Sequence, residues 1–137
     1  MPKTLEKRLK AVARGYEAFV AALPEPLSGQ AALLAKVLAP GAKNLAEHYG
    51  APESYPLLRF PLWLERKYVA DGLLTGDEGY GSDTAYASLM AYLYIRIQDN
   101  VLDEPEQFDS TFMLLGNEFV REFFYTYQRL FGQNSPF

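Results

Sequence analysis

Three carboxylates lie close together in the segment IRIQDNVLDEP, residues 95–105, and are the side chains of this sequence best suited to binding a metal ion. Asp99 and Asp103 are four residues apart, so on a helix they stack on one face, one turn above the other. Glu104 follows directly, and Pro105 stops the helix. Two carboxylates at this spacing repel each other unless a cation or a basic partner lies between them.

Mg²⁺ suits such a pair, because it takes one or two protein carboxylates and fills its other positions with water and substrate phosphates. The pattern therefore predicts a site for a metal and a diphosphate at the mouth of a helical pocket. The alternative interpretation is a solvated acidic helix end, since acidic pairs near helix ends are common.

The helix that carries this segment is predicted over residues 84–103 and is apolar on nearly every side, which is typical of the middle of a bundle. Stepping back from Asp99 by helical turns leads to further side chains on one face: Arg96, Ile95, Tyr92 and Ser88. We therefore expect this face of the helix to line a pocket of small and apolar groups, with the carboxylates at its mouth. A substrate with a polar head and an apolar tail would need that geometry.

Cations for a phosphate are predicted on the preceding helix, which we expect from Pro61 to Leu74. Arg59 lies just before it, and Arg66 and Lys67 lie on it. Arginine suits this role because its planar fork matches phosphate oxygens. The alternative is ordinary surface pairing, for example of Glu65 with a neighbouring turn.

Composition limits the class of protein. The 137 residues are 49% hydrophobic and 22% charged, with a net charge of −4, as expected of one globular domain with a large core. The basic residues are scattered, which argues against a nucleic-acid partner. The chain has no cysteine, no apolar run long enough to span a membrane, and no signal peptide at its charged start. We therefore expect a cytoplasmic protein.

The other segments also predict helices, over residues 4–23, 28–39, 42–49 and 110–131, so the expected fold is an all-α bundle of about five or six helices. Thr4, Ser28 and Ser110 are the expected helix caps. The loop at residues 75–83 is expected to be a flexible turn, with Ser82 or Asp83 as the next cap. His48 is expected at a helix end or on the surface, and a close approach of two helices would explain Gly116, inside the last one.

The motif resembles that of a known family. IRIQDNVLDEP, with an arginine three residues before the first aspartate, resembles the first aspartate-rich motif of class I isoprenoid synthases, most closely the squalene and phytoene synthase version. The order of segments is also similar to trans-prenyl diphosphate synthases. Arg59-Phe60-Pro61 opens a helix, a Gly-Asp turn follows, the long helix ends in aspartates, and LLGNEF lies in the next helix. The resemblance covers about residues 59–131.

The resemblance implies an all-α fold, similar to the N-terminal half of the isoprenoid synthase fold, that binds an allylic isoprenoid diphosphate through Mg²⁺. By matching positions, Asp99 and Asp103 would be metal ligands with Glu104 secondary, and Arg59 and Arg96 would contact the diphosphate. Loss of diphosphate would then leave a carbocation for coupling or cyclisation. Bulk just upstream of the first aspartate limits product length in prenyl synthases, and Tyr94 and Ile95 occupy that region here.

Two departures from the family bear on activity. Asn100 replaces a charged residue inside the motif, and the second acidic motif of the family has no counterpart in these 137 residues. We expect a single domain that forms part of a larger helical bundle and self-associates, because the apolar faces of its last two helices would otherwise be exposed. The alternative function is a non-catalytic helical binding or assembly module. A third interpretation, lipid carriage in the helical cavity, gives the carboxylates no role.

Overall fold

The computed structural model describes residues 3–54, 56–74 and 79–132, and the regular structure in this part of the chain is entirely α-helical. The helices are α1 (Lys3–Ala21), α2 (Leu27–Leu38), α3 (Leu45–Gly50), α4 (Arg59–Ala70), α5 (Tyr80–Asp103) and α6 (Phe112–Phe131). The predicted all-α bundle is confirmed. Over the same residues, no helix combines the length and the apolar character that crossing a membrane requires.

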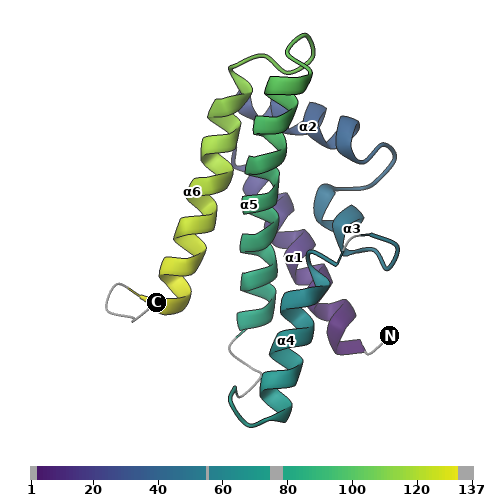
Figure 1. The fold of residues 1–137 in the computed structure, drawn as a ribbon, viewed down its shortest axis with the longest axis vertical. Helices are drawn as coiled ribbons and strands as arrows, with labels where there is room; N and C mark the ends of the chain where they lie inside the picture. Colours follow the sequence, from purple (N-terminus) through teal and green to yellow (C-terminus); the bar gives the residue numbers. More distant parts are fainter. Residues whose placement is uncertain (1–2, 55, 75–78, 133–137) are drawn as a thin grey trace.

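The long helix α5 is the axis of the molecule (Figure 1). Helix α6 runs beside it over much of its length, α4 packs at its lower end, and α1 packs behind it. Helix α3 lies on α1, while α2 packs against α6 and α1. The prediction that the apolar helix occupies the middle of the bundle is therefore confirmed.

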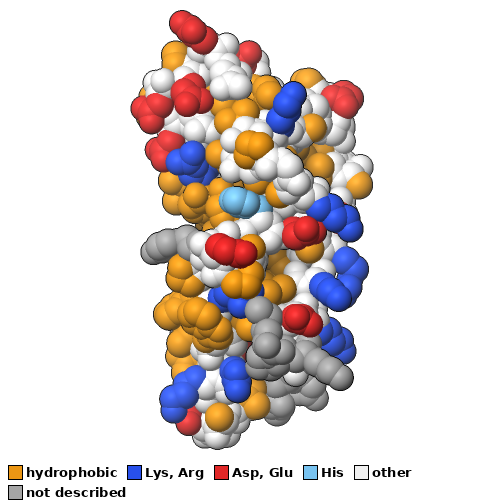
Figure 2. Space-filling model, turned by 90° about the vertical axis from the view of Figure 1, so that its right-hand side faces the viewer, with side chains coloured by type: hydrophobic (Ala, Val, Ile, Leu, Met, Phe, Trp, Pro, Cys, Tyr) orange, Lys and Arg blue, Asp and Glu red, His pale blue; other side chains and the backbone are white. Residues whose placement is uncertain are grey.

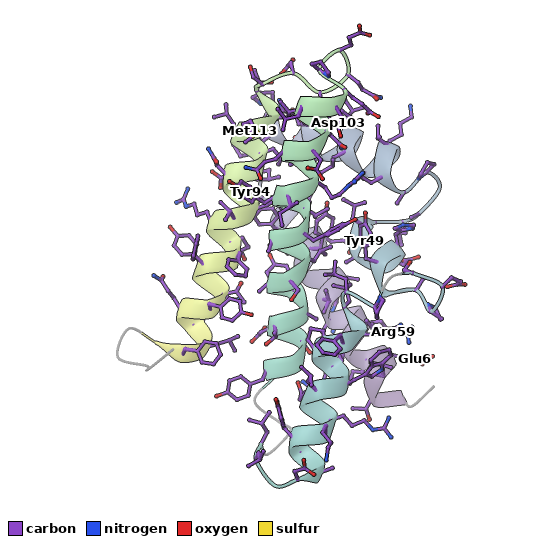
Figure 3. All side chains as sticks on the ribbon, viewed as in Figure 1. Glu6, Tyr49, Arg59, Tyr94, Asp103 and Met113 are labelled. Atoms are coloured by element: carbon purple, nitrogen blue, oxygen red, sulfur yellow. The ribbon has the colours of Figure 1, made fainter. Side chains whose placement is uncertain are left out.

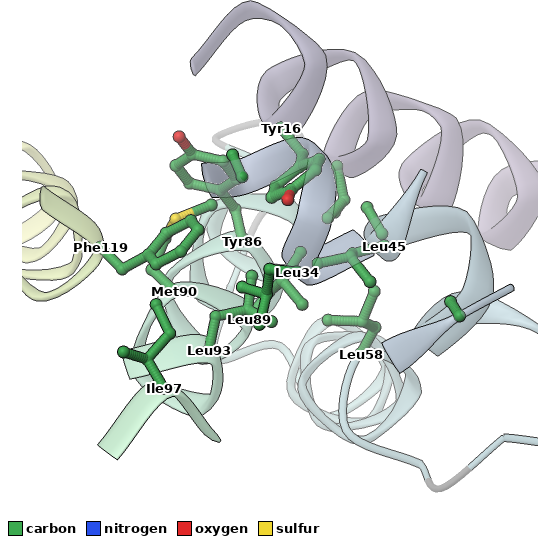
Figure 4. Close-up of a cluster of buried hydrophobic side chains, with 14 of the residues drawn as sticks. Tyr16, Leu34, Leu45, Leu58, Tyr86, Leu89, Met90, Leu93, Ile97 and Phe119 are labelled. Carbon is green, nitrogen blue, oxygen red and sulfur yellow. The ribbon is translucent and has the colours of Figure 1, made fainter. Parts of the chain in front are cut away.

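The core forms where five helices meet around α5 (Figure 4). Leu89, Met90, Leu93 and Ile97 of α5 are all fully buried, and they are surrounded by buried side chains of the other elements: Tyr16, Leu34, Leu45, Leu58 and Phe119. Burying one such leucine, valine or phenylalanine contributes about 1.5–3 kcal/mol, so this cluster is the main source of stability. It also holds α5 in place along the length that leads to the carboxylates.

Helices α5 and α6 come close at Gly116, as predicted. A Cβ added at Gly116 would lie 3.4 Å from the Tyr94 ring and 3.5 Å from Ile97, both on α5. These are ordinary van der Waals distances, so the helices approach closely here without requiring glycine.

Several predicted helix starts are wrong, and at α5 a contact from another helix takes the place of the expected cap. Helix α5 begins at Tyr80 and not near Thr84, so Ser82 and Asp83 lie inside it. The carboxylate of Glu65, on α4, instead binds the backbone N–H of Gly81 in the first turn of α5. This contact satisfies one of the amides that a cap would otherwise bind.

The other expected caps also lie elsewhere. Helix α1 includes Thr4, and Ser28 lies inside α2, where its hydroxyl donates to Glu25. Helix α6 has Thr111, and not Ser110, as its N-cap residue, and no side chain caps the helix there. The backbone N–H of Thr111 donates to the Asp109 carboxylate at 2.9 Å. Helix α4 begins two residues before Pro61. Of the turn predicted at residues 75–83, residues 80–83 belong to α5, while residues 75–78 lie outside the described residues, as do the C-terminal residues 133–137.

Candidate functional site

The carboxylates of the motif lie at the upper end of α5 (Figure 3). The helix is continuous through Asp103, so Asp99 and Asp103 lie one turn apart as predicted, and both side chains are exposed. Glu104 is the C-cap residue and is also exposed. Over the described ranges, no lysine, arginine or histidine forms an ion pair with these three carboxylates. Their mutual repulsion is therefore not relieved within this part of the chain.

The fit of this donor set to a metal is partial. In the part of the chain that the structure describes, no three His, Cys, Asp or Glu side chains come together in a way that could hold a metal ion. A pair of exposed carboxylates suits a site that phosphate oxygens and water complete, since Mg²⁺ keeps several waters and takes few protein ligands. Asp99 and Asp103 therefore remain predicted ligands, whereas Glu104 does not join them in a group of three.

Two buried donors lie on α5 next to these carboxylates. Arg96 is half-buried, and its Nε atom has no hydrogen-bond partner among the described residues. Asn100 is only 7% exposed, and its Nδ2 atom likewise lacks a partner there. The two residues are four apart, so their side chains leave the helix on one face. A buried donor without a partner costs about 1–3 kcal/mol, which an anionic or water oxygen would offset.

A pair of tyrosines adjoins these donors on the side of α3. The rings of Tyr49 and Tyr92 meet edge to face with centroids 5.0 Å apart. Burial raises the pKa of Tyr49, the hydrogen bond to Tyr92 raises this pKa further, and the positive charge of Arg96 lowers it. Tyr49 therefore lies close enough to Arg96 for the two side chains to interact electrostatically. Sequence reasoning missed Tyr49 and the burial of Asn100, because both depend on how α3 packs against α5.

The four predicted pocket residues have different neighbours. The Ser88 hydroxyl donates to the backbone carbonyl of Thr84 at 2.9 Å, and Tyr92 packs on Tyr49. Tyr94 packs at Gly116 of α6, and its hydroxyl accepts a hydrogen bond from Gln98 at 2.9 Å. Ile95 is 53% exposed. The structure does not bring these four side chains together around one cavity below the carboxylates.

Arg59 has a structural contact away from the motif. It is 8% exposed, and its Nε donates to the backbone carbonyl of Gly50 at 3.0 Å, which ties the start of α4 to the end of α3. In Figure 3, Arg59 lies well below Asp103 along the long axis of the molecule. The structure therefore brings Arg96, but not Arg59, next to the carboxylates.

A groove of about 790 Å³ lies at the other end of α5, between α4 and the C-terminal part of α6. Ser88 is part of its wall, together with apolar and aromatic side chains: Phe60, Leu64, Tyr68, Tyr80, Leu130 and Phe131. At its edge, Glu65 binds the Gly81 amide and forms an ion pair of 2.6 Å with Arg8 of α1. The alternative that Glu65 forms a surface pair is wrong for its location, because the structure buries this carboxylate between Arg8 and Gly81. Its spacing of three residues from Leu62, on the inward face, is the signal that sequence reasoning passed over.

Comparison with known proteins adds no identification: no family model, no curated protein and no solved structure matches the chain. The candidate site is therefore defined by its geometry and by the motif in its sequence.

Proposed function

We propose that the upper end of α5 binds an isoprenoid diphosphate together with Mg²⁺. The observation that carries this proposal is a pair of exposed carboxylates, Asp99 and Asp103, that no basic group of the described chain neutralises. The buried, unpaired Nε of Arg96 supports it, because a phosphate oxygen is the kind of acceptor that such a donor requires.

In this proposal, Asp99 and Asp103 hold the metal, Glu104 is a secondary acid beside them, and Arg96 binds the diphosphate. Arg59 would join it only if its Nε left the Gly50 carbonyl. The bound metal would neutralise the negative charge of the departing diphosphate, as expected of a prenyl transferase or terpene synthase. Tyr92 lies one turn below Arg96, where the first part of an isoprenoid chain would start.

A second copy of the chain, or a second half of a larger bundle, would supply the remaining acidic group. The surface of α5 and α6 supports this extension, because large apolar side chains on both helices are 46–79% exposed: Ile95, Leu102, Leu114, Phe124 and Tyr125. A covering partner would remove these groups from water.

A non-catalytic helical assembly module is the second candidate function. One observation favours it: the described residues hold no three-residue acidic group suited to a metal. In this case the carboxylates are a solvated helix end, and the exposed apolar side chains of α5 and α6 are the functional surface.

Calorimetric titration tests the proposal. We would titrate a non-hydrolysable farnesyl diphosphate analogue into the protein with and without Mg²⁺, and then into Asp99→Asn/Asp103→Asn. Binding should require Mg²⁺ and should be lost in the double variant, because two of the proposed ligands lose their charge. Arg96→Gln should weaken the Mg²⁺-dependent binding by about tenfold or more, since a hydrogen bond to a charged group contributes about 1.5–3 kcal/mol.

Glu106→Gln is the matched control, because Glu106 is an exposed acid just past the motif that is not a proposed ligand. It should bind like the parent. If the parent does not bind while circular dichroism shows it folded, the metal–diphosphate site is absent from this chain, and the assembly module becomes the better function.

A further inference from the structure

Helix α4 displays an apolar surface that the proposed function does not use. It consists of Phe60, Trp63, Leu64, Tyr68 and, just past the end of the helix, Leu73, and is called here the α4 aromatic face. These side chains are 37–69% exposed and make up five of the eleven large apolar side chains exposed in the described part of the chain. Its three aromatic side chains alone expose roughly 300 Å², which is already the size of a functional patch.

Helix α4 is amphipathic, but it turns charged side chains toward the bundle and aromatic ones toward solvent. Its inward side carries Arg59 and Glu65, both buried, around Leu62. Arg59 binds the Gly50 carbonyl, and Glu65 binds Arg8 and the Gly81 amide. Polar contacts therefore attach α4 to the bundle, while its aromatic side chains face solvent.

The charges that remain on the outside of α4 are mostly positive. Arg66 and Lys67 are exposed among the aromatic side chains, and Asp71, the one acid of this segment on the surface, pairs with Lys67 at 2.8 Å. A cleft of about 310 Å³ joins Trp63 and Arg66 to the start of α1, where Lys7 and Lys10 are exposed together with one acid, Glu6.

The densest group of acidic side chains lies at the opposite end of the molecule from α4. The acidic side chains Asp99, Asp103 and Glu104 lie at the upper end of α5, far from α4 (Figure 1). In Figure 2, the densest group of red side chains lies at the top and orange ones lie along the lower left, while the blue ones at the foot and along the right are interspersed with red ones. The α4 end is therefore the less acidic end of this face, and a negatively charged surface repels it less than the upper end.

We propose that the α4 aromatic face binds an anionic lipid surface and lies in the headgroup region without crossing it. Trp63 and Tyr68 have the apolar rings and polar tips that favour this region, and Phe60 and Leu64 supply apolar area beside them. Arg66 and Lys67 meet the lipid phosphates. A second copy is a poorer occupant, because a two-fold axis through this face would place the same cations against each other.

Trp63 makes the test direct, since it is the only tryptophan in the sequence. Its fluorescence would be followed while vesicles of phosphatidylcholine with phosphatidylserine, or of phosphatidylcholine alone, are added in the absence of Mg²⁺ and diphosphate. The emission should shift to shorter wavelength with the anionic vesicles only, and the protein should sediment with them. Because Mg²⁺ and diphosphate are left out, a lack of vesicle binding would not contradict the proposed site on α5.

Paired variants locate the surface. Phe60→Ala/Leu64→Ala should weaken vesicle binding by about tenfold or more, since both side chains lose apolar area that lipid would cover. Phe124→Ala/Tyr125→Ala, on α6, removes side chains of similar exposure and should bind like the parent. Arg66→Gln/Lys67→Gln should weaken binding to anionic vesicles about tenfold, while Lys36→Gln/Lys43→Gln should not.

Three results would overturn the proposal. One is the absence of a shift and of sedimentation with a folded protein, and another is equal binding to neutral and anionic vesicles. The third is a Trp63 shift that appears with rising protein concentration in the absence of vesicles, which would assign the face to a second copy.

Discussion

Asp99 and Asp103 place negative charge where the backbone disfavours it. The last turn of a helix carries a partial negative charge, and the last turn of α5, a helix described over its whole length, contains no basic residue. The stacking of these two carboxylates could be predicted from the sequence, because the spacing of four residues is a local property of a helix. The burial of Asn100 and the proximity of Tyr49 to Arg96 could not, since they depend on how α3 packs.

Asp103→Asn should therefore stabilise the protein when no metal is present. It removes one repulsion at a spacing of four residues and one unfavourable interaction with the helix dipole, so the free energy of unfolding should rise by roughly 0.5–1 kcal/mol. Urea denaturation in EDTA measures the change, with Glu106→Gln, outside the helix, as the control. A loss of stability would mean that Asp103 already has a favourable partner.

At the scale of the elements, the sequence predicted six helices in the right order but misplaced several of their starts. The number and order follow from apolar periodicity and from proline and glycine breaks, which are local signals. The start of α5 follows from the Glu65 carboxylate, which reaches the Gly81 amide from another helix. Tertiary contacts of this kind cannot be read from the residues next to the helix start.

Two glycine substitutions should have opposite effects for this reason. A Cβ at Gly81 would lie 2.8 Å from Cδ of Glu65 and displace this carboxylate, so Gly81→Ala should cost about 1–3 kcal/mol. A Cβ at Gly116 fits at 3.4 Å from Tyr94, so Gly116→Ala should stabilise by up to about 1 kcal/mol through helix propensity. Urea denaturation of both variants checks this, and equal effects would contradict the packing described for Glu65.

For the whole molecule, composition predicted an all-α bundle with a large core, because apolar content and helical periodicity are properties of the chain as a whole. The orientation of α4 was not predictable in this way. Hydrophobic patterning favours its aromatic side chains as the inward ones, and the structure places Arg59 and Glu65 inside. Only the positions of Arg8, Gly50 and Gly81 around them explain that choice.

Buried tyrosines should make the stability of the whole fold fall in alkali. Burial raises the pKa of Tyr16 and Tyr86 above the ordinary 10.0, and the carboxylate of Glu122 raises that of Tyr86 further. Below pH 10 both states keep these protons. Above it the unfolded chain ionises first, so stability falls, by roughly 1.4 kcal/mol per pH unit for a tyrosine buried like Tyr16.

Denaturation curves measured from pH 8 to 11 would test this dependence. Tyr86→Phe should lose less stability over the alkaline range than the parent, whereas Tyr68→Phe, at an exposed position, should follow the parent. A flat profile in the parent would show that these phenols ionise as readily in the folded protein as in the unfolded chain.

The reversed polarity of α4 also inverts the usual rule of which substitutions a helix accepts. A leucine in place of Glu65 would look conservative for an inward position, yet it would remove the carboxylate that pairs with Arg8 and accepts from the Gly81 amide. A lysine in place of Trp63 would look drastic, yet it would leave the fold intact and improve solubility. Among functioning variants of this protein, positions 59 and 65 should therefore stay polar beside the apolar Leu62, and apolar residues should persist on the outer side of α4 only where a binding partner requires them.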